Sequence, residues 1–198
     1  DHIFKNISQK RGAAIIHSNS FDFKLDLKGN YQKENCNTSV TAITEIKKLG
    51  WKISDQNIKE GLKNVIKNTK LEGRWQVLNK KPLIICDTAH NKDGLTAVIQ
   101  QILQINYNKL HIVFGAVNDK NIDELLDLLP KNAKYYFCKP NIPRGLNTNT
   151  LQEISYNKRI IGDTFSSVKD ALEKAKKNAN FNDLIFIGGS TFVVSEVL

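Results

Sequence analysis

The pattern of apolar and polar positions in residues 73–198 is regular. Short apolar runs occur at 83–86, 111–115, 135–138, 159–161 and 184–187. Between them, apolar residues recur every three or four positions, at 95–103, 122–129, 148–154 and 168–175. Short runs are typical of buried strands, and the longer period is typical of amphipathic helices. The alternation predicts an α/β fold with a mostly parallel sheet and helices on both faces.

Residues 1–72 are patterned differently. The run AAIIH (13–17) and the alternating stretch FDFKLDL (21–27) predict two strands. A helix is expected over 35–49, ended by Gly50, and Ser54 is expected to cap a second helix. Two strands and two helices make a thin unit, so this part is interpreted as the end of a domain whose beginning lies outside the chain.

Composition narrows the class of protein. No apolar run approaches the roughly 20 residues of a membrane span, and three widely spaced cysteines without a CxxC pair favour a reducing, cytoplasmic setting. The four histidines are scattered singly, so no metal-ligand cluster is predicted. The net charge of +9 is spread along the chain without a basic cluster, which argues against nucleic acid as the partner. Anionic small molecules suit such a diffuse field.

Polar residues follow four of the predicted strands, in CDTAHNKDG, GAVNDKN, KPNIPRG and GGST. The carboxyl ends of parallel strands meet at one edge of a sheet, which is where such folds bind ligands. Asp87 follows LIIC directly and suits the hydroxyls of a ribose; the alternative is an N-cap or Asx-turn carboxylate leading into the helix near Leu95. His90 and Asn91 lie on the same predicted loop. Because of these neighbours, we favour a functional role for His90 over a structural one.

A hairpin, RWQVL–NKKP–LIICD, is expected to return Arg74 to the side of Asp87. There its guanidinium suits phosphate oxygens, and the alternative is a structural ion pair with the aspartate. The GGST segment, with Ser190, suits a carboxylate or phosphate, or forms only a tight turn. The chain contains no GxGxxG, no GxxxxGK[ST] and no evident nucleophile paired with a histidine.

Together these segments resemble a known family. GRWQ…LIICDTAHNKDGL, VFGAVNDKNIDELLDLLP, KPNIPRGLNTNTLQE and IGGSTFVVSEVL, in this order and spacing, resemble the C-terminal half of bacterial bifunctional folylpolyglutamate synthase/dihydrofolate synthases, members of the Mur ligase superfamily. LKGNYQKENCNTSVTAI resembles the G-H-Q-x-x-N segment at the end of that family's central P-loop ATPase domain. The resemblance covers nearly the whole chain.

The resemblance implies an amide-forming ligase that uses ATP and Mg²⁺. The carboxylate of a folate or dihydropteroate becomes an acyl phosphate, which the amine of glutamate attacks. By the same resemblance Asn35 contacts adenine, Arg74 the ATP phosphates and Asp87 the ribose, while His90 and Ser190 lie on the glutamate side. Arg74 and His90 are thus the expected catalytic residues. The resemblance also suggests a monomer.

The chain departs from the family pattern in three ways. Tyr31 replaces the histidine of G-H-Q, and Lys92 replaces the proline that often follows AHN. The P-loop, the metal ligands and the folate-binding segments of the family belong to its N-terminal half. We therefore expect residues 1–72 to be the C-terminal remnant of the ATPase domain, residues 73–198 to be a complete Rossmann-like domain, and the chain to be inactive alone.

Two alternatives stay open. One is the C-terminal part of a UDP-muramoyl amino-acid ligase, whose domains carry a similar Asp-x-Ala-His motif; the VFGAVNDKNI and PRGL stretches favour the folate enzyme. The other is a non-catalytic Rossmann-like binding module, which salt-dependent DNA binding in a gel shift would favour. The sequence does not separate dihydrofolate synthase from folylpolyglutamate synthase activity.

Overall fold

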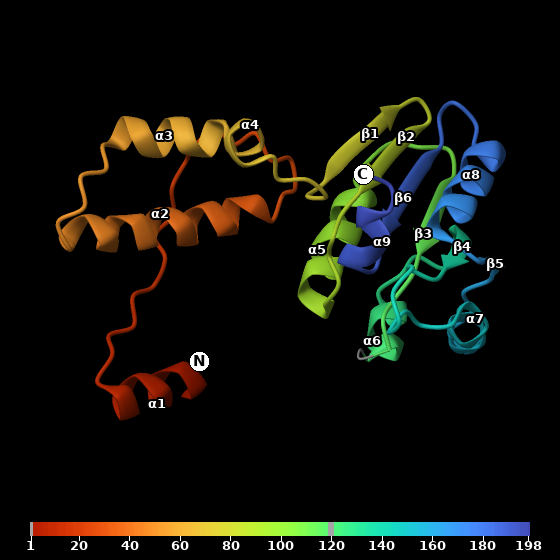
Figure 1. Cartoon of the computed structure of the whole chain (residues 1–198), viewed down its shortest axis with the longest axis horizontal. Helices are drawn as coiled ribbons and strands as arrows, with labels where there is room; N and C mark the ends of the chain where they lie inside the picture. The colour runs from red at the N-terminus through yellow and green to blue at the C-terminus, as the bar shows by residue number, and fades with distance from the viewer. Residues whose placement is uncertain (1, 119–120) are drawn as a thin grey trace. The chain divides into compact units, whose positions relative to one another are not determined.

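The computed structural model describes residues 2–118 and 121–198 (Figure 1). By its internal contacts the chain forms two compact units, described here separately. Unit 1 comprises residues 1–26 and 32–68, and unit 2 comprises residues 27–31 and 69–198. The assignment of residues 1–72 and 73–198 to two domains of a ligase stays a prediction. Among the described residues, no helix is both long and apolar enough to cross a membrane.

Unit 1 consists of helices. They are α1 (His2–Arg11), α2 (Gln32–Lys48), α3 (Asp55–Lys63) and α4 (Val65–Thr69), the last of which runs one residue into unit 2. Its fully buried apolar residues are few: Cys36, Val40 and Ile58. Helix α1 buries no residue. Unit 1 therefore has a small core for its length, as the thin pattern of residues 1–72 indicated.

The two strands predicted at 13–17 and 21–27 are not present as strands. The chain there is extended but joins no ladder in the described part of unit 1. Side chains of α2 bind its backbone instead: Thr41 Oγ1 accepts from Asn19 N at 3.0 Å, and Asn37 Oδ1 accepts from Phe21 N at 2.9 Å. The alternating pattern predicts a segment with one buried face, but a β-strand also needs a neighbouring strand whose backbone groups pair with its own.

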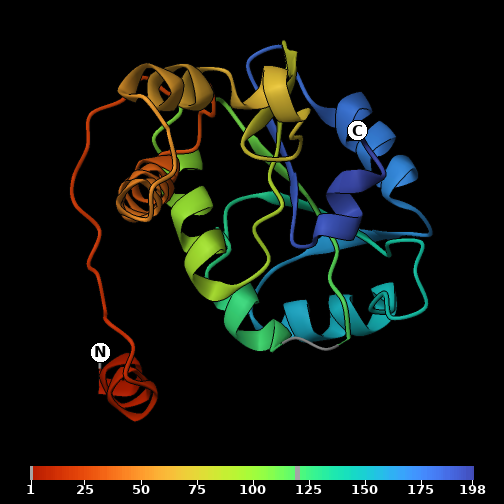
Figure 2. The ribbon, with the colours of Figure 1, turned by 60° about the vertical axis from the view of Figure 1, so that its left-hand side comes forward.

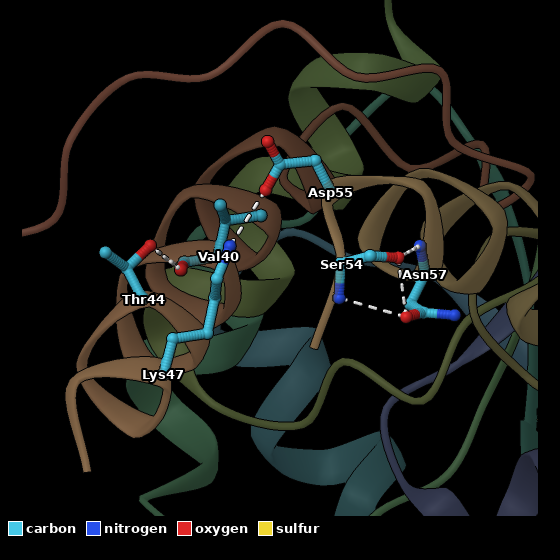
Figure 3. A network of polar contacts seen from close by, with 6 residues as sticks. All are labelled: Val40, Thr44, Lys47, Ser54, Asp55 and Asn57. Carbon is cyan, nitrogen blue, oxygen red and sulfur yellow. Dashed lines mark hydrogen bonds and ion pairs between the residues drawn. The ribbon is translucent and has the colours of Figure 1, made fainter. Parts of the chain in front are cut away.

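The junction of α2 and α3 is closed by local polar contacts (Figure 3). Ser54 caps α3 as predicted: its Oγ accepts from Asn57 N at 3.1 Å, and Asn57 Oδ1 accepts from Ser54 N at 3.0 Å. Lys47 Nζ lies 2.9 Å from Asp55 Oδ1, which joins the last turn of α2 to the first turn of α3. Gly50 has φ +96°, a left-handed conformation that ends the α2 segment at the predicted residue.

Unit 2 is built around a six-stranded sheet of order β1-β2-β6-β3-β4-β5. Its strands are β1 (Gln76–Lys80), β2 (Leu83–Cys86), β3 (Leu110–Phe114), β4 (Lys134–Cys138), β5 (Gly162–Phe165) and β6 (Leu184–Gly188). The β1–β2 pair is antiparallel, and every other pairing is parallel. The prediction of a mostly parallel α/β sheet is confirmed, including the hairpin before Asp87.

Helices cover both faces of this sheet (Figures 1 and 2). They are α5 (Lys92–Ile102), α6 (Ile122–Asp127), α7 (Thr148–Asn157), α8 (Val168–Asn178) and α9 (Thr191–Ser195). Alternate residues of β6 enter opposite cores: Leu184 and Phe186 pack with α5, α6 and α7, and Ile185 and Ile187 pack with α8 and α9. Burial on both faces is the reason that these strands appear in the sequence as continuous apolar runs.

One strand lies later in the chain than predicted. The run at 159–161 is a turn, and the strand beside it is β5, at 162–165. Arg159 has φ +60°, which ends the α7 segment, and Ile161 is 74% exposed. The first residue of β5 is Gly162, where a Cβ would lie 2.5 Å from the Cβ of Tyr135 on the neighbouring strand. The prediction from apolar residues alone therefore placed this edge strand too early in the chain.

The amino-terminal edge of the sheet carries a buried polar network. His111 Nδ1 lies 2.9 Å from Tyr136 Oη, and His111 Nε2 lies 3.3 Å from Asp183 Oδ2. Asp183 also accepts from the backbone N–H groups of Lys109, at 3.1 Å, and Asn180, at 2.7 Å. Burial lowers the pKa of His111. Burial opposes ionisation of Asp183, but its hydrogen bonds prevail and lower its pKa.

We expect unit 2 to lose stability as pH falls below about 6.5, the ordinary pKa of histidine. Because the pKa of His111 is lower in the folded state, the unfolded chain binds the proton first, and acid favours unfolding. The lowered pKa of Asp183 acts in the same direction at more acidic pH. Denaturant unfolding followed by the fluorescence of buried Trp75, in a Trp51→Phe background, measures this dependence.

His111→Gln should flatten the dependence between about pH 7 and pH 5, because the titrating group is removed. His17→Gln is the matched control: His17 is exposed, and its replacement should leave the slope of stability against pH unchanged. A His111→Gln protein with the pH dependence of the parent chain would contradict the assignment.

Candidate functional site

Four parallel strands end at one edge of unit 2. Cys86 of β2 pairs with Ile187 of β6, and Phe114 of β3 pairs with Gly188 of β6 and Phe137 of β4. The loops that follow these strands carry the polar segments identified in the sequence. The predicted polar rim is therefore present at the carboxyl edge, although residues 119–120 of the GAVNDKN segment lie outside the described residues.

Asp87 is the first residue after β2 and is fully buried. Its Oδ2 accepts from Trp75 N at 2.8 Å and from Tyr31 Oη at 2.6 Å, and its Oδ1 accepts from Ala89 N at 2.8 Å. Burial raises the pKa of Asp87, while these hydrogen bonds and the nearby charge of Arg74 lower it in part. The bond to Ala89 N is the local turn contact of the structural alternative, although Asn91 and not Asp87 caps α5. The contact of Asp87 with a ribose stays a prediction.

The hairpin brings Arg74 to the side of Asp87, as the sequence predicted. Thr88 N donates to Gly73 O at 2.9 Å, which fixes the start of the hairpin to the loop after β2. Gly73 has φ +72°, and a Cβ there would lie 2.8 Å from Thr88 Cγ2, so the close approach requires glycine. Burial raises the pKa of both Asp87 and Tyr31, and the positive charge of Arg74 offsets part of that rise, which shows that Arg74 lies near both groups. Arg74 is exposed to solvent.

His90 lies on the same loop and is exposed. Its Nδ1 lies 3.0 Å from Thr88 O. A carbonyl oxygen only accepts, so Nδ1 carries the proton in this contact and Nε2 is an acceptor in the neutral ring. Asn91 begins α5, with its Oδ1 accepting from Gly94 N at 2.9 Å. The loop thus combines an oriented imidazole with a helix cap.

Ser190 follows β6, between the loops of β2 and β3. It is 2% exposed, and its Oγ accepts from Phe192 N at 3.2 Å as the cap of α9. Gly189 has φ +92°, and a Cβ there would lie 2.5 Å from Gly115 O, so the segment is also a tight turn. A Cβ on Gly188 would lie 3.2 Å from Asp87 O, which places this loop beside Asp87.

Asn35 lies in unit 1 and is described apart from the other four residues. It is exposed on the first turns of α2, where its Nδ2 donates to Gln32 Oε1 at 2.9 Å. Unit 2 thus brings together Arg74, Asp87, His90 and Ser190. The predicted contact of Asn35 with adenine stays a prediction.

The structure adds two residues that sequence reasoning did not select. Tyr31 donates to Asp87, although the sequence marked it only as a departure from a histidine. Arg144, from the loop after β4, has its guanidinium carbon 5.1 Å from the ring centroid of Phe192, in the helix that Ser190 caps. Arg144 belongs to the KPNIPRG segment, which the sequence placed after a strand of the parallel sheet. Loops at that edge are where such folds bind ligands, so this position could have been selected.

No group of three or more His, Cys, Asp or Glu side chains in the described part of the chain is arranged to hold a metal ion. The candidate site has the guanidinium of Arg74 near the carboxylate of Asp87, with the imidazole of His90 on the loop that Asp87 begins.

Asp87→Asn should lower the unfolding free energy of unit 2 by about 1–3 kcal/mol. Whichever way the amide is turned, its NH₂ group faces a hydrogen-bond donor that the carboxylate now accepts from. Denaturant unfolding measures the loss. Asp93→Asn, at an exposed position in the first turn of α5, is the control and should change stability far less. Equal effects of the two substitutions would contradict the central role of Asp87.

Comparison with known proteins shows what the chain is similar to. The family described as Mur ligase, glutamate ligase domain, matches residues 73–191. A probable bifunctional folylpolyglutamate synthase/dihydropteroate synthase of Haloferax volcanii is 30% identical over 195 residues, covering 96% of this chain and 22% of that protein.

Two solved structures are similar, each 28% identical and covering 81% of this chain and 38% of theirs. One is the bifunctional folylpolyglutamate synthase/dihydrofolate synthase of Yersinia pestis complexed with AMPPNP and Mn ion, with a TM-score of 0.67. The other is such an enzyme with Mn, AMPPNP and L-glutamate bound, with a TM-score of 0.69. The chain spans less than half the length of these proteins. With the family match over most of its length, the chain belongs to the Mur ligase family, as a carrier of its glutamate ligase domain.

Proposed function

We propose that this chain forms the C-terminal wall of the active site of an ATP-dependent ligase, which joins glutamate to a folate or dihydropteroate carboxylate through an acyl phosphate. The observation that carries the proposal is the convergence of Arg74, Asp87 and His90 at the carboxyl edge of unit 2. The similar enzymes with AMPPNP, Mn and L-glutamate bound support it.

Arg74 is the residue that binds phosphate in this proposal. Its guanidinium is exposed, and it belongs to a hairpin held to the loop of Asp87 by the Thr88–Gly73 hydrogen bond of 2.9 Å. A planar fork of donors in a fixed place suits the oxygens of a phosphate, and it stabilises negative charge that develops during phosphoryl transfer. Asp87 binds the ribose, and Asn35 of unit 1 is proposed to contact adenine.

His90 and Ser190 lie toward the glutamate in this proposal. His90 lines a cleft of about 250 Å³ together with Asn91, Lys92, Asn121, Glu124 and Leu125. With Nδ1 donating to Thr88 O, the other ring nitrogen of His90, Nε2, is the one proposed to accept a proton from the attacking amine. Arg144 adds a positive charge beside the helix that Ser190 caps, which suits a carboxylate.

Magnesium would supply charge neutralisation at the phosphates. The described residues contain no cluster suited to it, so in this proposal its ligands come from the part of such ligases that the chain does not match. The 198 residues also contain no P-loop sequence. The chain then supplies one wall of the site, and positions a nucleotide without completing the reaction.

We expect residues 1–198 alone to bind ATP weakly and to form no product, because the P-loop that would hold the phosphates is absent from this sequence. A coupled assay of ATP hydrolysis with dihydropteroate and glutamate tests this expectation. Turnover at the rate of a complete ligase would overturn it.

Arg74→Ala should weaken ATP binding roughly tenfold, the usual effect of losing a charge-assisted contact. Arg74→Lys should restore little, because an ammonium does not reproduce the guanidinium fork. Isothermal titration with MgATP measures both. Lys80→Ala is the control, since it removes the same charge from the far end of β1. Equal ATP affinity in Arg74→Ala and Lys80→Ala would remove Arg74 from the proposed site.

A further inference from the structure

The carboxylate of Asp87 is occupied by donors from the protein itself. An ionised carboxylate has about four lone-pair positions on its two oxygens. Three donors already use them: Trp75 N and Tyr31 Oη on Oδ2, and Ala89 N on Oδ1. Only one position, on Oδ1, is left for a ligand. The side chain is also fully buried, so a ligand reaches Asp87 only where something moves aside.

The three donors differ in how easily they can leave. Trp75 N and Ala89 N are backbone groups, and each moves only with its chain. The hairpin of Trp75 is fixed by the 2.9 Å bond from Thr88 N to Gly73 O, and Ala89 is two residues from Asp87. Tyr31 Oη is the end of a half-buried side chain, and rotation about its side-chain bonds releases it. Tyr31 is therefore the exchangeable donor.

The loop that carries Tyr31 is built to hold the phenol in this place. Gln101 of α5 makes two hydrogen bonds to the backbone of this loop through its side-chain amide. Its Oε1 accepts from Asn30 N at 2.6 Å, and its Nε2 donates to Lys28 O at 3.1 Å. The tyrosine ring lies against Gly29, where a Cβ would be 2.6 Å from Tyr31 Cε1. Burial and the charge of Asp87 raise the pKa of Tyr31, so its hydroxyl stays a donor at neutral pH.

We propose that the Tyr31 hydroxyl competes with a ribose hydroxyl of a bound nucleotide for the same acceptor position on Asp87 Oδ2. This rests on the proposed nucleotide site. Tyr31 is then the residue that sets how strongly the site distinguishes nucleotides with ribose hydroxyls from those without. A ribose hydroxyl that binds Asp87 replaces the hydrogen bond from Tyr31, so it adds little to nucleotide affinity while Tyr31 is present.

Removing the phenol hydroxyl changes this balance. In Tyr31→Phe the ring remains, but Asp87 Oδ2 loses one of its two donors and keeps only Trp75 N. A ribose hydroxyl then restores the missing bond, whereas a nucleotide without hydroxyls does not. The preference for ATP over dideoxy-ATP, which lacks both ribose hydroxyls, should rise roughly tenfold, as expected when a polar group is left unpaired.

Isothermal titration of the 198-residue chain with MgATP and with Mg-dideoxy-ATP tests the proposal. We expect the parent chain to bind the two nucleotides within about threefold of each other, since the ribose gains no net hydrogen bond. Tyr31→Phe should favour ATP by roughly tenfold more than the parent does. Tyr135→Phe is the matched control: it removes a hydroxyl that donates to Pro130 O at 2.6 Å, at the start of β4, and should keep the parent preference.

An unchanged preference in Tyr31→Phe, or an equal loss of affinity for both nucleotides, overturns the role of Tyr31 and leaves the nucleotide site standing. Absence of binding of either nucleotide to both proteins overturns the proposed function, and this inference with it. Carbon NMR of ring-labelled tyrosine in the parent chain gives a second readout that needs no variant. ATP should shift the Tyr31 signal and dideoxy-ATP should not; equal shifts with both overturn the exchange.

Discussion

The buried carboxylate of Asp87 is the interaction on which the carboxyl edge of unit 2 depends. Its oxygens accept from Tyr31, Trp75 and Ala89, and its own N–H donates to Ile187 O at 3.1 Å. One residue therefore joins the loop at 27–31, the β1 hairpin, the turn before α5 and the central strand β6. Burying a charged group costs free energy unless its hydrogen bonds are made. The hydrogen bonds of Asp87 come from segments far apart in the sequence.

This arrangement explains how a small set of glycines positions the proposed site. Gly73 and Gly189 have left-handed backbone conformations, and Gly188 lies so close to Asp87 that a side chain would meet its carbonyl oxygen. Because these positions lack a Cβ, Gly73 can lie against Thr88, Gly188 against Asp87 and Gly189 against Gly115. The same closeness brings Arg74 beside Asp87. Backbone geometry therefore sets where the side chains of the proposed phosphate and ribose contacts begin.

The two edges of the sheet use buried polar groups in different ways. At the amino edge, the hydrogen bonds of Asp183, His111 and Tyr136 connect the starts of strands and leave no group at the surface. At the carboxyl edge, Arg74 and His90 are exposed beside the buried Asp87. The first network stabilises the sheet. The second combines a fixed carboxylate with accessible polar groups, which is the arrangement expected of a ligand site.

The sequence by itself determined the α/β class, four of the five predicted strands of the parallel sheet, the cap at Ser54 and the meeting of Arg74 with Asp87. Burial on both faces produces apolar runs, and a short hairpin must return the chain to its start, so these features are local in origin. Tertiary structure alone decided the rest. The alternating stretch at 21–27 is no strand, because the described part of unit 1 offers no backbone to pair with. The phenol of Tyr31 lies on Asp87, 56 residues away, because chain packing and not sequence spacing brings two such groups together.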